Sequence, residues 1–484
     1  MSFDLVLFGG TGDLAWRKLM PALFQAFRHG TLPEGGRIIG VARDDLTDAQ
    51  YRTLIQTRFD SVEGAKRPNA EEFARFADLL QFVRMDLSKP DDYARLAASL
   101  AQRNADTVVM YVATAPALFG ITCEQIAAAG LNRSNTRIVL EKPLGHDLAS
   151  NRAINDTVRS AFSERQVFRI DHYLGKPSVQ NLFALRFGNA LFEPLWRRET
   201  IANIQITIAE DLGVEKRGAF YETTGTLRDM VQNHALQLLC AIGMEPPINA
   251  HADAIRDEKL KVLRSLKPWT AETLSQHVVR GQYTAGISGG APVPGYRDEA
   301  GVSPQSRTET FVALRTEIAN WRWAGVPFYI RTGKRLAERD AHIEVNFRPT
   351  PHAIFKSSLG AANRLVINLQ PKDGLELHLL AQGQHNRRNA QSLSPVQLDL
   401  DFDTRFGSER VGAYERLLLD VIDGRLNLFV RSDEQEEAWR WVEPVLDFWK
   451  ADPQAPRPYA AGTWGPSASS ALIARDGYCW SEES

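Results

Sequence analysis

The stretch Leu5-Val6-Leu7-Phe8-Gly9-Gly10-Thr11-Gly12-Asp13-Leu14-Ala15 decides the fold of this chain of 484 residues. A short apolar run with strand character enters a glycine-rich turn, and Leu19, Leu23 and Phe27 then recur at helical spacing. Glycines permit a tight turn and let a pyrophosphate approach the N–H groups at a helix start, where the dipole favours its charge. The turn reads GxxGxxA rather than GxGxxG, so the pattern predicts a dinucleotide-binding loop and leaves a plain βα turn as the alternative.

Strands and helices alternate throughout the first third of the chain. The patterns predict strands at 37–42, 82–85, 106–112 and 136–140, and helices near 48–59 and 70–80. Repeated βαβ units imply a doubly wound parallel sheet with right-handed crossovers, which binds nucleotides at the carboxyl ends of its strands. We therefore expect residues 1–170 to form a Rossmann-like dinucleotide-binding domain within an α/β protein.

The strict alternation ends near residue 200. Strand-like runs at 200–209, 309–316 and 365–369 lie among separate helices, which predicts a larger C-terminal α+β domain over residues 171–484. Its sheet is expected to be large and mostly antiparallel, with one face free for helices or for a second subunit. Residues 289–295, rich in glycine and proline, are predicted to be a loop, and residues 381–395 are assigned no function.

Composition excludes several classes of protein. A hydrophobic share of 44%, a charged share of 24% and a net charge of −2 indicate an ordinary globular protein without a nucleic-acid partner. Cys123, Cys240 and Cys479 are widely separated and lack metal-ligand spacing, so we expect no zinc, no disulfides and a reducing cytoplasm. The sequence shows no signal peptide and no apolar run long enough to span a membrane.

Residues 169–176 form the strongest candidate substrate site. Asp171, His172, Tyr173 and Lys176 follow a short apolar strand and precede a helical pattern that begins at Pro177. A helix N-terminus already favours an anion, and the imidazole and the ammonium would add donors and charge. The pattern predicts a site for phosphate or carboxylate, and a solvated loop with a helix cap remains the alternative.

The residues after the second predicted strand bear on the choice of dinucleotide. Arg43 stands where an enzyme restricted to NAD would place an acidic residue, and an arginine there suits the 2′-phosphate of NADP. Asp44 follows directly and could reach a ribose, so NADP is favoured while use of NAD stays open. The alternative is a surface arginine in a turn. Lys142, in Glu141-Lys142-Pro143, is expected at the boundary between cofactor and substrate.

The predicted helix after Gly225 places His234 on an apolar stripe. A lone histidine there is more often a hydrogen-bonded core residue than a catalyst. Asp229, Asn233 and Gln237 accompany it, however, and an enzyme that oxidises an alcohol by hydride transfer needs a base for the hydroxyl proton. His234 is therefore the candidate general base.

At these residues the chain resembles the glucose-6-phosphate dehydrogenase family, along essentially its whole length. The stretches that carry the resemblance are GGTGDLA (9–15), EKPLG (141–145), RIDHYLGK (169–176), DMVQNH (229–234), GVPFYIRTGK (325–334) and YERLL (414–418). The resemblance implies oxidation of β-D-glucose 6-phosphate at C1 to the 6-phosphogluconolactone with hydride transfer to NADP. That reaction is the first step of the oxidative pentose phosphate or Entner-Doudoroff route.

The resemblance also implies a role for each matching residue. His234 matches the general base, and Asp171 matches the carboxylate that orients it. The expected substrate ligands are Lys142, His172, Tyr173, Lys176, Glu210, Asp229, Lys334 and Arg339. The expected cofactor-binding residues are Gly9, Gly10, Thr11, Gly12, Asp13, Leu14, Lys18, Arg43 and Lys142. The larger domain of the family dimerises through its sheet, which implies a homodimer or a homotetramer here.

The chain departs from the family pattern at two positions. Pro177 replaces a common glutamate, which fits the first position of a helix, and Trp16 stands where relatives often carry a lysine. The residues also leave two other functions open. One is another sugar oxidoreductase with a Glu-Lys-Pro lysine, and the other is a non-catalytic NADP sensor, which would have lost His234 or Asp171.

Overall fold

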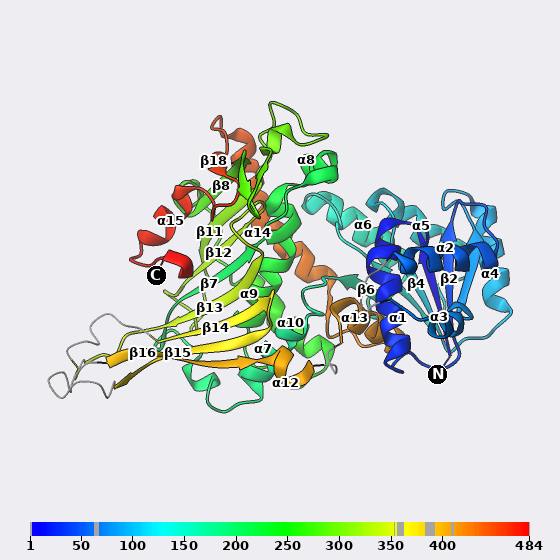
Figure 1. Cartoon of the computed structure of the whole chain (residues 1–484), viewed down its shortest axis with the longest axis horizontal. Coiled ribbons are helices and arrows are strands. Elements are labelled where there is room, and N and C mark those ends of the chain that lie inside the picture. Colours follow the sequence, from blue (N-terminus) through cyan, green and yellow to red (C-terminus); the bar gives the residue numbers. More distant parts are fainter. Residues whose placement is uncertain are drawn as a thin grey trace. The chain divides into compact units, whose positions relative to one another are not determined.

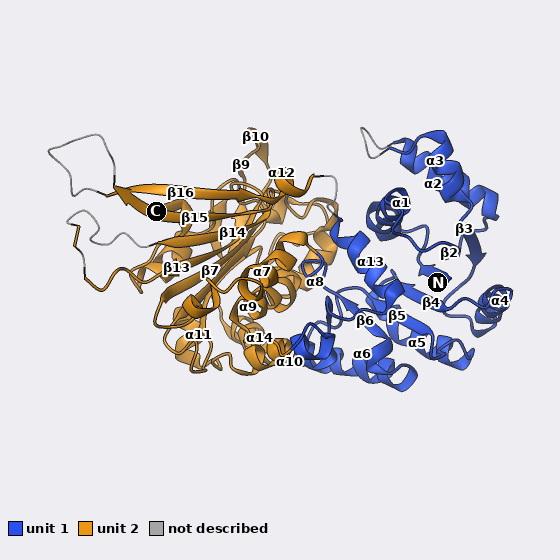
Figure 2. Ribbon diagram, turned by 90° about the horizontal axis from the view of Figure 1, so that it is seen from below, with its two compact units in different colours: residues 1–175, 249–256, 411–436 blue, residues 176–248, 257–410, 437–484 orange. Residues whose placement is uncertain are grey.

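The computed structural model divides into two compact units, which are coloured separately in Figure 2. Unit 1 comprises residues 1–175, 249–256 and 411–436, and unit 2 comprises residues 176–248, 257–410 and 437–484. The structure describes residues 2–61, 67–352, 354–355, 363–382, 393–407 and 411–483. The division of the chain into domains at residues 170 and 171 stays a prediction.

Unit 1 is built on a seven-stranded sheet with the strand order β17-β6-β5-β4-β1-β2-β3. Every neighbouring pair is parallel except β17 with β6. Without β17 the order is that of a doubly wound dinucleotide-binding sheet, so the predicted architecture is confirmed. The strands are β1 (Phe3–Phe8), β2 (Gly36–Ala42), β3 (Leu80–Arg84), β4 (Thr107–Val112), β5 (Thr136–Leu140), β6 (Val167–Ile170) and β17 (Phe429–Val430).

Helices lie on both faces of this sheet (Figure 2). Val6 and Phe8 of β1 share one buried cluster with Leu96 of α4, Phe119 of α5 and Val158 of α6, and α13 packs against β4 and α1. Since side chains alternate along a strand, β1 is buried at every position, as a sheet covered twice requires. The helices are α1 (Met20–Arg28), α2 (Asp48–Asp60), α3 (Ala70–Ala77), α4 (Pro90–Ala101), α5 (Phe119–Ala128), α6 (Leu148–Ala161) and α13 (Ala413–Asp423).

Unit 2 contains a nine-stranded sheet with the order β16-β15-β14-β13-β7-β12-β11-β8-β18 (Figure 1). Its neighbours are antiparallel except for the pairs β7–β12 and β8–β18, so the predicted large and mostly antiparallel sheet is confirmed. The strands are β7 (Ile201–Ala209), β8 (Val278–Thr284), β11 (Phe311–Glu317), β12 (Pro327–Gly333), β13 (Asp340–Phe347), β14 (Arg364–Gln370), β15 (Gly374–Gln382), β16 (Leu393–Asp401) and β18 (Arg457–Ala460).

Helices pack against this sheet from several parts of the chain. Helix α7 contacts β14 and α9, and α15 contacts β8 and β11. The helices that lie in unit 2 include α7 (Pro177–Phe187), α8 (Gly218–Thr226), η7 (Leu227–Ala235), α9 (Leu236–Gly243), α11 (Ala271–His277) and α15 (Ser467–Ala474), while α10 (Ala252–Arg264) and α14 (Ser432–Ala451) have residues in both units. Across the described ranges, no helix has the length and apolar character needed to cross a membrane.

Three local predictions differ from the structure. Helix α3 ends at Ala77, so the next strand occupies 80–84 rather than 82–85. The helix that carries His234 begins as the π-helix η7 and becomes α-helical only at α9, because the spacing of apolar residues cannot separate two helix types with similar periods. The predicted loop at 289–295 forms part of a hairpin, in which β9 (Gly286–Ser288) pairs with β10 (Ala291–Val293).

The two glycines of the turn explain why this hairpin forms. Gly289 and Gly290 both adopt positive φ, at 56° and 79°, and these angles form the two-residue turn that suits the twist of paired strands.

Of the unassigned stretch 381–395, residues 383–392 lie outside the described residues, and its two ends belong to the paired strands β15 and β16.

Candidate functional site

The glycine-rich turn follows β1 directly and lies against β2. The N–H groups of Gly9 and Gly10 both donate to the Val41 carbonyl oxygen, at 2.8 and 3.0 Å. Gly9 has a φ of +85°, and a Cβ atom on Gly10 would lie 2.7 Å from the Cα atom of Gly40. Only glycine allows this approach, and the turn then enters the helical segment η1 (Ala15–Leu19). The turn therefore has the backbone geometry expected of a pyrophosphate-binding loop.

Polar side chains surround Thr11 in this turn. Its hydroxyl donates to Asp44 Oδ2 at 2.8 Å, and its carbonyl accepts from the Arg58 guanidinium at 3.2 Å. The guanidinium carbon of Arg58 also lies 5.9 Å from the ring centroid of Trp16. Arg43 is exposed beside Asp44. Asp44 thus accepts a hydrogen bond from the Thr11 hydroxyl, and its carboxylate is of the kind that accepts from a ribose hydroxyl in enzymes of this fold.

The remaining predicted cofactor residues lie on the same turn and on η1. Asp13 forms an exposed ion pair with Arg17 at 2.8 Å, and Lys18 is exposed one position further along the helix. Gly12 donates its N–H to the carbonyl oxygen of Gly9 at 2.9 Å, which closes the turn, and Leu14 precedes η1. The structure thus gathers the predicted loop residues at the carboxyl end of β1.

The segment Glu141-Lys142-Pro143 follows β5. The Tyr111 hydroxyl donates to Glu141 Oε1 at 2.6 Å, and burial raises the pKa of the Glu141 carboxyl above its ordinary value. Lys142 is half-buried and is joined to Pro143 by a cis peptide bond. Since β5 lies between β4 and β6 in a parallel arrangement, Lys142 leaves the same edge of the sheet as the glycine-rich turn.

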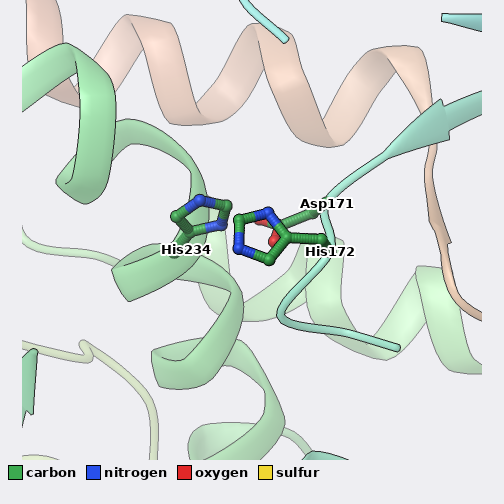
Figure 3. Close-up of side chains that lie close together, drawn as sticks. All are labelled: Asp171, His172 and His234. Carbon is green, nitrogen blue, oxygen red and sulfur yellow. The ribbon is translucent and has the colours of Figure 1, made fainter. Parts of the chain in front are cut away.

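The candidate anion site begins where β6 ends. Asp171 Oδ1 accepts the Tyr173 backbone N–H at 3.0 Å, which closes a tight turn, and the His172 ring lies parallel to the Tyr414 ring with centroids 6.0 Å apart. Arg169 is fully buried and donates to Glu164 and Asn155, so it serves the structure of this segment. Figure 3 shows Asp171 and His172 on the segment that leaves β6.

Lys176 caps the start of α7. Pro177 occupies the first turn of that helix, as predicted, and the Lys176 Nζ donates to Gln370 Oε1 at 2.9 Å. Gln370 lies at the end of β14 and was not anticipated from the sequence. The backbone of Lys176 thus stands at a helix N-terminus, where an anion is favoured, and its ammonium is held at the end of β14.

His234 lies on η7 (Figure 3) and is 1% exposed. Glu309, which is buried, anchors the start of this helix: its Oε1 accepts the Leu227 N–H at 3.0 Å, and its carbonyl oxygen accepts the Thr226 N–H at 3.1 Å. Burial raises the pKa of the Glu309 carboxyl. π-Helices are rare and occur frequently at functional sites, and this one brings an imidazole and the carboxylate of Asp229 onto a single segment.

Three predicted substrate ligands form one cluster in unit 2. Lys334 Nζ lies 2.6 Å from Glu210 Oε2 and 4.0 Å from Asp229 Oδ2. The parallel pairing of β7 with β12 explains this, because Ala209 lies opposite Gly333 and the next residue on each strand is a cluster member. The ammonium also lies 5.2 Å from the ring centroid of Tyr221. The two carboxylates can accept hydrogen bonds from sugar hydroxyls, and the ammonium can donate hydrogen bonds to them.

Other expectations have a different outcome. Arg339 is exposed directly before β13, and over the described part of the chain it forms no ion pair with the cluster of Glu210, Asp229 and Lys334. Asp171 and His172 belong to unit 1 and His234 to unit 2, so the pairing of Asp171 with His234 stays a prediction.

Sequence reasoning missed several residues that the structure brings to these sites. They are Arg58, Glu141, Tyr221, Glu309, Gln370 and Tyr414. Glu141 and Tyr414 were inside stretches that carried the family resemblance, so their positions were available as a signal. The others act through contacts between segments far apart in the chain, which a single sequence does not reveal.

Comparison with known proteins covers nearly the whole chain. The family model described as "Glucose-6-phosphate dehydrogenase, NAD binding domain" matches residues 6–181, and "Glucose-6-phosphate dehydrogenase, C-terminal domain" matches residues 183–481. The chain is 49% identical to glucose-6-phosphate 1-dehydrogenase of Rhizobium meliloti (strain 1021), over 99% of this chain and 98% of the relative.

Two solved structures are also similar. One is the X-ray structure of glucose-6-phosphate 1-dehydrogenase from Mycobacterium avium, with a TM-score of 0.85, 37% identity and 99% of each chain covered. The other is a glucose-6-phosphate dehydrogenase in complex with its substrate glucose-6-phosphate, with a TM-score of 0.90 and 31% identity. The match covers 99% of this chain and 98% of that one.

The close approach at Gly10 gives a direct test of the dinucleotide loop. In Gly10→Ala the new Cβ would meet the backbone of Gly40, so the turn must move away from β2. We expect affinity for a reduced nicotinamide dinucleotide, measured by fluorescence titration, to fall by at least about tenfold.

Gly120→Ala is the matched control. Gly120 lies in helix α5, and its new Cβ would make an ordinary contact of 3.5 Å with the side chain of Thr157 in α6. This variant should bind the dinucleotide as the unchanged protein does. Equal affinity in the Gly10 and Gly120 variants would contradict the assignment of the loop.

Proposed function

Because the chain belongs to the glucose-6-phosphate dehydrogenase family, we propose that it oxidises β-D-glucose 6-phosphate at C1 to 6-phospho-D-glucono-1,5-lactone, with hydride transfer to NADP. The observation that carries the proposal is similarity over the full length of both chains, at 49% identity to a named glucose-6-phosphate 1-dehydrogenase. The proposed reaction is the first step of the oxidative pentose phosphate or Entner-Doudoroff route.

The two other functions are not favoured. A different sugar oxidoreductase with a Glu-Lys-Pro lysine would have no need for the phosphate residues at 169–176, which this chain keeps. A non-catalytic sensor would have lost the base or its carboxylate, and both His234 and Asp171 are present. The full-length relatives are dehydrogenases acting on the 6-phosphate.

In the proposed mechanism, His234 takes the proton of the C1 hydroxyl and Asp171 orients the imidazole and stabilises its positive charge. A bound nicotinamide ring supplies the acceptor for the hydride that leaves C1. Burial of both side chains supports these roles, since a shielded base meets little competition from water. The rigid start of η7 at Glu309 supports a fixed position for the imidazole.

The substrate is proposed to bind at two places. The ligands of the phosphate are His172, Tyr173 and Lys176, and the ligands of the sugar hydroxyls are Glu210, Asp229 and Lys334, with Lys142 reaching both substrate and cofactor and Arg339 as a further contact. The cluster of Glu210, Asp229 and Lys334 within unit 2 supports the second group, and the position of Lys176 at a helix start supports the first.

NADP is the proposed cofactor, with NAD as a second one. Arg43 provides a cation for the 2′-phosphate beside Thr11, while Asp44 provides an acceptor for a free ribose hydroxyl. The two side chains therefore act in opposite directions on cofactor choice. Residues 1–170 are proposed to serve the cofactor, and residues 171–484 the substrate and subunit contacts.

A homodimer or homotetramer in the cytoplasm is proposed, with the sheet of unit 2 as the contact surface. Val396, Leu398 and Leu400 alternate along β16 and are 40%, 59% and 47% exposed. An apolar row on an edge strand of a large sheet is typical of a subunit interface.

A steady-state comparison of NADP and NAD, each with glucose 6-phosphate and with glucose, tests reaction, phosphate site and cofactor together. We expect a kcat/KM for glucose 6-phosphate far above that for glucose, and activity with both dinucleotides. Equal kcat/KM for glucose and glucose 6-phosphate would favour the other sugar oxidoreductase.

The base assignment predicts a specific kinetic change. His234→Asn should lower kcat by roughly 10²–10⁴ while the dissociation constant for glucose 6-phosphate changes little, because the amide cannot take the proton. Lys176→Ala is the contrasting variant, which should raise KM for glucose 6-phosphate without a comparable loss of kcat. Turnover of His234→Asn near that of the unchanged enzyme would refute the role of His234.

Cofactor choice is predicted to move in opposite directions in two neighbouring variants. Arg43→Ala should lower the ratio of kcat/KM for NADP over NAD, because a cation for the 2′-phosphate is lost. Asp44→Asn should raise the same ratio, because a negative charge beside that phosphate is removed. If Asp44→Asn left the ratio unchanged, the pairing of Asp44 with Thr11 would have no part in the choice of cofactor.

Subunit association is predicted to depend on the exposed row of β16. Leu398→Lys should shift the mass measured by light scattering after size-exclusion chromatography towards the monomer. Ile248→Lys is the control, since Ile248 is 91% exposed and lies outside the sheet. The proposed interface would be wrong if Leu398→Lys kept the mass of the unchanged protein.

A further inference from the structure

We infer that Tyr414 is a positioning residue for the phosphate end of the substrate site: its ring stacks on the His172 imidazole and holds that imidazole in place. The inference rests on the proposed function, in which His172 binds the substrate phosphate. It assigns a role to α13 (Ala413–Asp423), which is distant from residues 169–176 along the chain.

The first step of the argument is the environment of Glu141. This carboxylate is buried at the end of β5 and accepts a hydrogen bond from the Tyr111 hydroxyl at 2.6 Å. A buried carboxylate needs such donors, since removing one leaves an acceptor without compensation. Tyr111 supplies such a donor to Glu141, and the contribution of Tyr414 to the site lies in its ring.

The second step is the contact between the two rings. The planes of Tyr414 and His172 make an angle of 15°, and their centroids are 6.0 Å apart. Stacking of this kind limits rotation of the imidazole about its side-chain bonds. A ligand that is already ordered does not lose that freedom when the phosphate arrives, which improves binding. Burial also raises the pKa of the Tyr414 phenol, which keeps the ring neutral beside an anion.

The third step is the anchoring of α13 on both sides of Tyr414. The next residue, Glu415, is buried and its Oε1 lies 2.7 Å from His29 Nδ1. A Cβ atom on Gly175 would lie 2.8 Å from the Ala413 carbonyl oxygen and 2.9 Å from Leu417 Cγ. The helix thus lies directly against the turn that carries His172, and glycine at 175 permits that distance.

The side chains of β4 explain why the network forms on this side of the sheet. Met110 and Val112 point into the core beneath α4, α5 and α6. Tyr111 lies between them in the strand, so its side chain points to the opposite face, against which α13 packs. The Tyr111 phenol therefore donates to Glu141 on the face of the sheet against which α13 packs.

The test compares Tyr414→Leu, Tyr414→Phe and Tyr111→Phe. Tyr414→Leu removes the stacked ring and should raise KM for glucose 6-phosphate about threefold to tenfold, with a smaller change in kcat. Tyr414→Phe keeps the ring and should recover most of that loss. Tyr111→Phe removes the hydrogen bond to Glu141 but keeps the Tyr414 ring, so its KM should change less than that of Tyr414→Leu.

A double-mutant cycle with His172→Asn separates this inference from the proposed function. If Tyr414 acts through His172, Tyr414→Leu should add little to KM in the His172→Asn background. A full additional increase there would overturn the inference while leaving the phosphate role of His172 intact. An unchanged KM in His172→Asn alone would instead refute the phosphate role.

Binding of glucose 6-phosphate without cofactor, followed by calorimetry, gives a readout independent of turnover. The dissociation constant should follow the order of KM among the variants. If Tyr414→Leu does not fold, Tyr414→Phe still tests the role of the ring, which this variant keeps. An unchanged dissociation constant in Tyr414→Phe would support the ring as the essential part. A loss of affinity in Tyr414→Phe larger than the loss in His172→Asn would overturn the inference.

Discussion

Parallel strands place their carboxyl ends along one edge of a sheet, and the proposed chemistry of unit 1 depends on that constraint. The glycine-rich turn follows β1, Lys142 follows β5, and Asp171 follows β6, each within two residues of its strand. These segments are up to about 160 residues apart in the chain, and hydrogen bonding between strands aligns their ends. The same geometry accounts for Tyr111 reaching Glu141 from the neighbouring strand.

In unit 2, one pair of parallel strands likewise brings the residues that follow them together. Its sheet is mostly antiparallel, yet Glu210 and Lys334 follow the two strands of a parallel pair, and their side chains meet at 2.6 Å. Asp229 joins them from η7, whose first turn is fixed by the buried carboxylate of Glu309. In both units, these polar groups therefore project from strand ends or helix starts, where the backbone is held firmly by its own hydrogen bonds, whereas the proposed base His234 lies near the end of η7.

Much of the fold was readable from local patterns, and the failures have physical causes. Alternation of apolar strands and helices predicted the parallel sheet of unit 1, because buried strands and amphipathic helices have different periods. The same periodicity did not distinguish the π-helix η7 from an α-helix, since both present apolar residues every three to five positions. The hairpin at Gly289 and Gly290 was missed although its two-glycine turn was visible in the sequence.

The sequence by itself determined the residue types, the motifs and their order: a glycine-rich turn after a strand, a cluster of charged and aromatic residues before a helix, and a histidine on an apolar stripe. Those features depend on local backbone preferences and spacing. Tertiary structure alone decided the partners, such as Asp44 for Thr11, Gln370 for Lys176 and Tyr414 for His172. These contacts join residues 33 to 242 positions apart, and only the packing of helices on sheets brings such segments within reach of a hydrogen bond or a stacked ring.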